Sequence, residues 1–261
     1  MGNWKWNFRK QAAVLAGVVL LDGAVLGAAI GVMQPGHPVS TVRAADAEAA
    51  GERQQTEEPE EPEKSAEPEN PEKSKNPAKP VALTFDDGPH ETCTAGLVDG
   101  LKERGVHATF FLMGENIEGN EELVRRMQAE GHLIGNHSYR HIQLTKAGED
   151  AVCQAVDRTE EMIEDITGNR PQYLRPPYGD WNENLECRMN LTTVFWTVDS
   201  LDWKLQNTAK IVRRVEKDVK AGDIILMHDI FPTSVEAALQ LVDRLQAEGY
   251  TFVTVDELLI D

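Results

Sequence analysis

The hydrophobic and polar positions of this chain follow two repeating patterns from residue 81 onward. Short runs rich in apolar and β-branched residues predict strands, and longer stretches with apolar residues at helical spacing predict helices. The strands are predicted at residues 81–85, 108–112, 133–136, 173–175, 193–198, 223–227 and 251–253. The helices are predicted near residues 92–104, 121–130, 147–167, 181–189, 208–220 and 233–248. Seven strands that alternate with helices predict an α/β fold, either a parallel βα barrel or an open doubly wound sheet.

The longest predicted helix, residues 147–167, has one apolar side and one acidic side. Val156 and Ile163 belong to the apolar side, which is predicted to be buried. Glu160 and Glu161 belong to the acidic side, which is predicted to face solvent.

An apolar segment at residues 12–33 precedes this pattern and is interrupted by Asp22. The basic residues in front of it are Lys5, Arg9 and Lys10. The segment is long enough to span a bilayer with its amino terminus inside. Asp22 would cost roughly 2.5–3.5 kcal/mol there, and small residues between positions 42 and 47 suit a signal-peptidase site. Residues 1–44 are thus expected to be a cytoplasmic stub with a transmembrane segment or a cleaved signal peptide, and either puts the remainder outside the cytoplasm.

The next segment, residues 45–78, is dominated by Glu, Pro, Lys and Ala, with Glu-Pro pairs such as Glu58-Pro59. It shows no apolar periodicity, so it cannot form a core and is expected to be a disordered acidic linker. Residues 79–261 are long enough to form one globular domain.

Charge narrows the classes of partner. The net charge is −18 at pH 7, and the part of the chain after residue 80 is itself strongly acidic. Nucleic acid is not expected as a partner, because phosphate binding needs clustered Lys and Arg. A neutral glycan is compatible with this charge. The three cysteines, Cys93, Cys153 and Cys187, lack metal-site spacing, and their odd number leaves at least one thiol unpaired in a monomer.

Residues that bind metals or move protons follow the ends of several predicted strands. They are Asp86, Asp87, His137, His141, Asp202 and His228. In a repeating βα chain, active sites lie beyond the carboxyl ends of the strands. Together with Arg175, these side chains follow the first, third, fourth, fifth and sixth strands. This spread around the ring favours the barrel, since a doubly wound sheet would gather them at one crevice.

The first two motifs suggest a metal centre. Thr84-Phe85-Asp86-Asp87-Gly88-Pro89 places one carboxylate to ligate a metal and the next to take a proton, although an Asx turn before the following helix would also explain it. His137 and His141 would be neighbours on one face of a helical turn. With Asp87 they form a set of two histidines and one carboxylate, which is typical of catalytic zinc and also of non-haem iron.

Three further segments close later strands. They are Arg175-Pro176-Pro177-Tyr178-Gly179, Asp199-Ser200-Leu201-Asp202-Trp203 and Leu226-Met227-His228. In the first, the prolines stiffen the backbone, and Arg175 can hold a carboxylate through two hydrogen bonds. Its turn can also aim a backbone N–H into the site. Taken alone, a turn of this kind or a single histidine at a strand end is also compatible with a structural role.

In this order and spacing, the five segments resemble the motifs of the polysaccharide deacetylases, carbohydrate esterase family 4, also called the nodulation-factor deacetylase homology domain. The resemblance covers residues 79–260. It implies a distorted seven-stranded βα barrel, similar to a TIM barrel. It also implies one divalent metal, with zinc expected and cobalt, nickel or manganese as alternatives, and hydrolysis of the acetamide on an N-acetylated glycan.

The resemblance also implies roles at the motif positions. The implied metal ligands are Asp87, His137 and His141. The implied proton-transfer residues are Asp86 as general base and His228 as general acid. The other implied site residues are Arg175 beside Asp86, Asp202 beside His228, the backbone N–H of Tyr178 at the oxyanion site, and Trp203 and Leu226 at the acetyl pocket.

The expected substrate is peptidoglycan N-acetylglucosamine, because a flexible tether suits a target just outside the membrane. Peptidoglycan N-acetylmuramic acid, chitin oligomers, poly-N-acetylglucosamine and acetylxylan are alternatives. Two other classes of protein are a non-catalytic, metal-dependent glycan-binding module, which would lack proton-transfer residues, and an iron oxidoreductase, which would need a cosubstrate pocket. No obligate protein partner is inferred.

Overall fold

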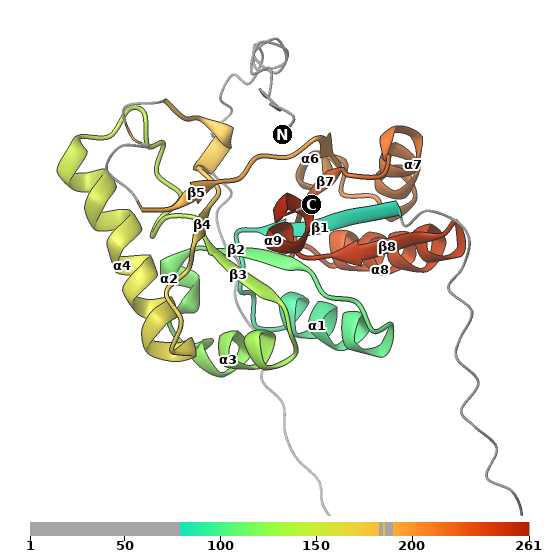
Figure 1. Cartoon of the computed structure of the whole chain (residues 1–261), viewed down its shortest axis with the longest axis horizontal. Coiled ribbons are helices and arrows are strands. Elements are labelled where there is room, and N and C mark those ends of the chain that lie inside the picture. The colour runs from blue at the N-terminus through green and yellow to red at the C-terminus, as the bar shows by residue number, and fades with distance from the viewer. Residues whose placement is uncertain (1–78, 183–184, 186–189, 261) are drawn as a thin grey trace, which may run out of the picture. The chain divides into compact units, whose positions relative to one another are not determined.

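The computed structural model describes residues 79–182, 185 and 190–260 (Figure 1). The predicted membrane segment, the acidic linker and Cys187 lie outside these residues, as does most of the helix predicted at 181–189. Among the residues that are described, no helix combines the length and apolar character needed to cross a membrane.

Parallel strands form one sheet at the centre of the described domain. The strands are β1 (Lys79–Asp86), β2 (Thr109–Leu112), β3 (Leu133–Asn136), β4 (Tyr173–Leu174), β5 (Thr192–Thr193), β6 (Val198–Asp199), β7 (Ile224–His228) and β8 (Tyr250–Val253). Their order is β5-β4-β3-β2-β1-β7-β6, and β8 pairs with the first half of β1. Strands β1 to β7 follow the cyclic order of a βα barrel opened between β5 and β6, whereas β8 lies on the β2 side of β1 and not between β7 and β1. The fold is therefore a curled parallel half-barrel, which confirms the predicted parallel α/β sheet but not a closed ring of strands.

The strand predicted at residues 193–198 is wrong in one respect, because the described chain forms two short strands there, β5 and β6. Arg175 explains the interruption. Its buried guanidinium donates to the backbone carbonyls of Val194 at 3.4 Å and Phe195 at 3.2 Å. Because these carbonyls accept hydrogen bonds from a buried cation, they do not pair within the sheet and the strand is interrupted. The described sheet therefore has eight strands, one more than the seven predicted.

Helices pack against the outer side of the sheet. They are α1 (Cys93–Glu103), α2 (Gly114–Ile117), α3 (Glu121–Ala129), α4 (Glu149–Thr167), α6 (Asp202–Leu205), α7 (Thr208–Asp218) and α8 (Pro232–Ala247). The last helix, α9 (Val255–Ile260), packs on the opposite face, where Val255 is in a cluster with Ala82 and Phe111. A 3₁₀ turn covers Pro177–Gly179. Helix α8 packs between α1 and α7, and α3 packs against α4 (Figure 1).

The two faces of β1 separate the core from the chemistry. Leu83 and Phe85 are fully buried in the main core, which the sheet shares with α1, α7 and α8. Ala82 belongs to a second apolar cluster on the other face. Because side chains alternate along a strand, Thr84 and Asp86 follow Ala82 on this inner face. The sequence alternation thus delivers a carboxylate to the inner face at the strand's carboxyl end.

Helix α4 corrects a second prediction. Val156 and Ile163 are buried as predicted, but Glu160 is buried too, with 5 % of its surface exposed. Glu160 lies four residues after Val156 and three before Ile163, so it shares their face of the helix. Arg170 compensates the buried carboxylate through an ion pair of 2.5 Å.

Candidate active site

The ends of β1 and β7 place Asp86 beside His228. The two strands are parallel neighbours, and Asp86 is the register partner of His228. Both side chains lie at the carboxyl ends of their strands, where parallel α/β folds carry their active sites. Residues that are far apart in the sequence are therefore brought together by the sheet register alone.

Arg175 fixes the carboxylate of Asp86. Its Nη1 donates to Asp86 Oδ1 at 2.8 Å and to Thr84 Oγ1 at 2.7 Å. The guanidinium is fully buried and its central carbon lies 4.2 Å from the centre of the Phe111 ring. The prediction that Arg175 holds a carboxylate through two hydrogen bonds is wrong. Arg175 makes one hydrogen bond to Asp86, and its Nε and Nη2 atoms donate to backbone carbonyl oxygens instead. Asp86 Oδ2 lies instead 3.8 Å from His137 Nε2.

Asp87, His137 and His141 converge on one point. Asp87 Oδ1 lies 3.5 Å from His137 Nε2 and 3.6 Å from His141 Nε2. One possible ligand atom from each of the three residues lies within 4.8 Å of the others. The structure therefore brings together the three predicted metal ligands.

The chemistry of this set fits a divalent metal. Asp87 Oδ1 is buried and has no hydrogen-bond partner among the described residues, although buried polar atoms are normally satisfied. The Nδ1 of His137 lies 2.7 Å from the Arg175 carbonyl oxygen, to which it donates, so Nε2 carries the lone pair. Burial lowers the pKa of both His137 and His141 and favours their neutral, ligating form. Burial also raises the pKa of Asp87, a cost that a bound cation would offset.

The histidine pair does not lie on a helical turn, so that part of the prediction is wrong. Residues 137–141 form an irregular loop, in which Ser138 has a φ of 63° and His141 a φ of 51°. The side chain of Asn136 accepts the Ser138 N–H at 2.7 Å and turns the chain away from a helix. The loop still places the two imidazole rings 5.0 Å apart.

Asp202 holds His228 through two bonds. Its Oδ1 lies 2.7 Å from His228 Nδ1, and its Oδ2 accepts the His228 backbone N–H at 2.7 Å. This contact assigns a proton to Nδ1 and leaves Nε2 to exchange the second proton. Burial opposes the charged imidazolium, but the bond to Asp202 and the charges of Asp202, Asp86 and Asp87 outweigh it and raise the pKa of His228 to about 9.

Three other predicted site residues lie next to these groups. The Tyr178 ring makes an edge contact with the His141 ring at 4.4 Å between centroids, and its backbone has a φ of 63°. Trp203 follows Asp202, donates its backbone N–H to Asp202 Oδ1 at 2.8 Å, and is 41 % exposed. Leu226 is buried two residues before His228, on the same face of β7.

Sequence reasoning missed Asp229. It follows His228 directly, is fully buried, and accepts a bond of 2.5 Å from Thr94 Oγ1. Burial raises the pKa of its carboxyl to about 7. A carboxylate next to a proposed catalytic histidine was the available signal, but nothing in the sequence shows that it turns inward.

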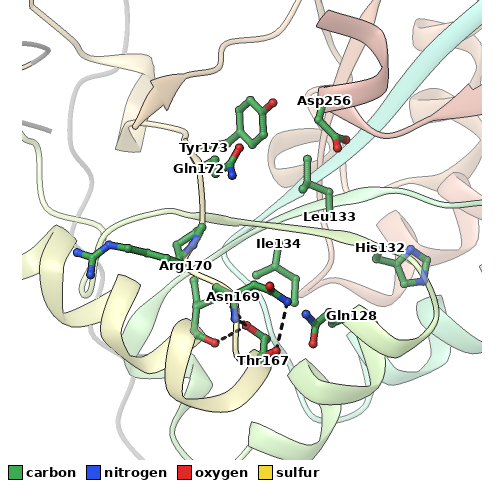
Figure 2. A pocket seen from close by; sticks show the side chains of 12 residues that line it. Gln128, His132, Leu133, Ile134, Thr167, Asn169, Arg170, Gln172, Tyr173 and Asp256 are labelled. Atoms are coloured by element: carbon green, nitrogen blue, oxygen red, sulfur yellow. Dashed lines mark hydrogen bonds between the residues drawn. The ribbon is translucent and has the colours of Figure 1, made fainter. Parts of the chain in front are cut away.

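A cavity of about 300 Å³ lies at the opposite ends of the strands (Figure 2). Its lining includes Leu133 and Tyr173, where β3 and β4 begin, with Thr167 from the end of α4 and Asp256 from α9. None of the strand-end residues described above lines it. This cavity is therefore separate from the candidate site at the carboxyl end of the sheet.

Comparison with known proteins agrees with this geometry. The family model described as polysaccharide deacetylase matches residues 73–194. The peptidoglycan-N-acetylmuramic acid deacetylase PdaC of Bacillus subtilis is 41% identical over 180 residues, which is 69% of this chain and 38% of that protein. A peptidoglycan-N-acetylglucosamine deacetylase of Bacillus cereus is 39% identical over 185 residues, which is 68% of this chain and 67% of that protein. The chain spans about two fifths of the length of the first curated relatives that it matches.

The solved structures show the same relation. The structure of peptidoglycan deacetylase PdaC from Bacillus subtilis is similar to this fold with a TM-score of 0.68 and 41% identity, and the match covers 69% of this chain and 90% of that one. The residues matched by the family model include Asp87, His137 and His141. The chain therefore belongs to the polysaccharide deacetylase family.

Proposed function

We propose that this protein is a zinc-dependent deacetylase that hydrolyses N-acetyl groups of peptidoglycan, with N-acetylglucosamine as the first expected sugar. The observation that carries this proposal is the placement of Asp86 and His228, two proton-transfer groups, in register around the set of Asp87, His137 and His141. A non-catalytic module would have no need of a proton donor with its own carboxylate partner.

Metal binding is assigned to Asp87, His137 and His141. When bound there, a divalent metal polarises the acetamide carbonyl and favours deprotonation of water near neutral pH. Three protein ligands leave further positions open, as catalytic zinc requires.

Asp86 is the proposed general base. Arg175 holds its Oδ1, so its Oδ2, on the side of His137, is the atom that takes the proton from the attacking water. Burial of Arg175 keeps this orientation rigid. The Tyr178 backbone N–H is the proposed donor to the developing oxyanion, since the turn at Pro177–Gly179 sets Tyr178 against His141.

His228 is the proposed general acid. Its Nδ1 is committed to Asp202, so Nε2 carries the proton that the leaving amine receives. With a pKa of about 9, His228 is protonated at neutral pH and ready to donate. Trp203 and Leu226 flank this pair and are proposed to contact the acetyl group.

The substrate class is supported by the relatives, which are named as peptidoglycan N-acetylglucosamine or N-acetylmuramic acid deacetylases. Their names differ in the sugar, so both sugars belong in the test. An extracytoplasmic location, with residues 12–33 as membrane anchor or cleaved leader and residues 45–78 as linker, suits a substrate just outside the membrane.

The test is release of acetate by the full chain, stripped with chelator and reloaded with zinc. Purified peptidoglycan, N-acetylglucosamine oligomers and acetylxylan are supplied in parallel. We expect zinc-dependent acetate from peptidoglycan, and analysis of the product identifies the deacetylated sugar. Zinc uptake without acetate from any of these glycans would contradict the proposed activity and favour the binding module.

Two variants test the assignment of roles. His228→Ala is expected to lower kcat by about 10²–10⁴ while zinc stays bound. Asp87→Ala is expected to lose zinc, which mass spectrometry of the native protein detects. His107→Ala, at an exposed histidine outside the site, is the matched control and should change neither property. Near-normal turnover of His228→Ala would disprove its role as acid, and stoichiometric zinc in Asp87→Ala would disprove its role as ligand.

A further inference from the structure

Asp229 lies beneath the loop that carries the proposed metal ligand Asp87. Its carboxylate is fully buried, and Thr94 Oγ1 donates to its Oδ2 at 2.5 Å. Thr94, which is also fully buried in α1, accepts the His90 backbone N–H at 2.8 Å. A chain of two hydrogen bonds thus joins the end of β7 to the loop of residues 87–92.

The same carboxylate is in close contact with Gly88. A Cβ added to Gly88 would lie 2.4 Å from Asp229 Oδ2 and 2.6 Å from Oδ1, distances that real Cβ atoms do not show. The loop therefore rests directly on the Asp229 side chain. Two hydrogen bonds hold the loop from its other side. The Met113 backbone N–H donates to the Gly88 carbonyl oxygen at 3.0 Å, and the Asn116 side-chain amide donates to the Asp87 carbonyl oxygen at 2.7 Å.

The cost of burying Asp229 argues against a role in stability alone. Asp229 Oδ1 is buried without a hydrogen-bond partner among the described residues, and an unsatisfied buried polar atom costs about 1–3 kcal/mol. Asp87, which the loop presents, has a φ of 73°, a conformation that persists where the surroundings enforce it.

We propose that Asp229 is a positioning residue, which locks the loop bearing Asp87 onto the strand end bearing His228. Through Thr94 and Gly88, it sets the distance between the metal ligands and the proton donor. This inference rests on the function proposed above for the same site. Asp229 touches neither substrate nor metal in this role, and its effect on both passes through the loop.

The experiment compares three variants of the full chain. Asp229→Ala removes the support and the acceptor, and Thr94→Val removes the hydroxyl while keeping the shape. Both are expected to weaken zinc binding by about 10–100-fold, as outer-shell changes do, and to lower kcat more than they change KM. Asp229→Asn keeps the side-chain volume and an acceptor for the Thr94 hydroxyl. This variant should therefore retain most of the zinc affinity of the unmodified chain.

Zinc affinity is measured by calorimetric titration of the metal-free protein, which needs no substrate. If the unmodified chain binds zinc but releases no acetate, the proposed function is contradicted. The inference about Asp229 can still be tested in that case through zinc affinity. Glu160→Ala is the matched control, since Glu160 is a buried carboxylate that lies in α4 and pairs with Arg170. It should lower the melting temperature and leave zinc affinity unchanged.

The inference is overturned if Asp229→Ala behaves as Glu160→Ala does, with a lower melting temperature but normal zinc affinity and kcat. If Asp229→Ala does not fold, Thr94→Val decides the question, and normal zinc binding in that variant overturns the inference. A chain that takes up no zinc in its unmodified form overturns it as well.

Discussion

Five residues in the motif segments hold a backbone conformation that non-glycine residues rarely adopt. They are Asp87, Ser138, His141, Tyr178 and Leu201, with φ angles between 51° and 73°. Each such conformation costs on the order of 1–3 kcal/mol and is found mainly where function demands it. The strain therefore marks the same end of the sheet as the titratable side chains, and it independently supports the proposed location of the active site.

The pair of Asp202 and His228 leads to a prediction about pH. In the proposed mechanism His228 donates a proton, so turnover should fall as pH rises through its pKa of about 9. Asp202→Asn removes the charge that raises this pKa, so the alkaline limb of the kcat profile should move toward or below about 6.5, the ordinary value. Asp180→Asn, at a carboxylate that bonds Thr145 and Gln143 instead, should leave the limb in place. An unchanged limb in Asp202→Asn would contradict the assigned role of the pair.

At the scale of residues, the sequence predicted the positions of the proposed proton-transfer residues better than those of the residues that support them. Asp86 and His228 were found because strand ends can be located from apolar runs, and strand ends meet at one edge. The support from Asp229 was missed, because its contact with Gly88 depends on how a loop folds back over β7. The two-bond grip of Arg175 was wrong for a similar reason, since the carbonyls of Val194 and Phe195 compete for its N–H groups.

At the scale of elements, most predicted bounds agree with the structure within one or two residues, because buried strands and amphipathic helices have strong periodic patterns. Two failures share a physical cause. Both occur where a polar side chain forms a hydrogen bond with the backbone. Arg175 donates to the Phe195 carbonyl in the gap between β5 and β6, and Asn136 accepts the Ser138 N–H in the loop of residues 137–141. The periodicity of apolar residues does not show where a side chain will bond to the backbone.

Two glycines provide a test of element stability. Gly168 ends α4 with a φ of 72°, and Gly96 lies within α1; a Cβ at either position would meet nothing within 4 Å. Gly168→Ala should therefore destabilise the protein by about 1–2 kcal/mol through backbone conformation alone. Gly96→Ala should stabilise it by up to about 1 kcal/mol through helix propensity. Chemical denaturation measures both, and the same sign for the two changes would contradict the assigned backbone conformations.

At the scale of the whole molecule, the proposed arrangement is a catalytic domain held outside the cell membrane by residues 12–33 and the acidic linker. If the leader is not cleaved, this tether would limit the distance that the domain can travel and keep the local concentration of a wall substrate high. The strongly acidic chain also disfavours binding to anionic polymers, so a neutral glycan strand suits it better than nucleic acid.

This arrangement predicts the outcome of a protease experiment on producing cells without their walls. Added protease should degrade the domain, while a cytoplasmic marker survives. Carbonate extraction then separates the two fates of the leader, because an anchored chain stays with the membrane and a cleaved one is recovered in solution. Protection of the domain from external protease would contradict the proposed location.

The pairing of β1 has a consequence for how activity is lost. Along one edge β1 pairs with β7, and along the other it pairs with β8 and then with β2. The strand that presents Asp86 therefore has no free edge from which to fray, and its amide protons should exchange with solvent only through global opening. Heat inactivation should accordingly coincide with the melting of the whole domain, so an assay of residual acetate release would double as a measure of how much protein is still folded.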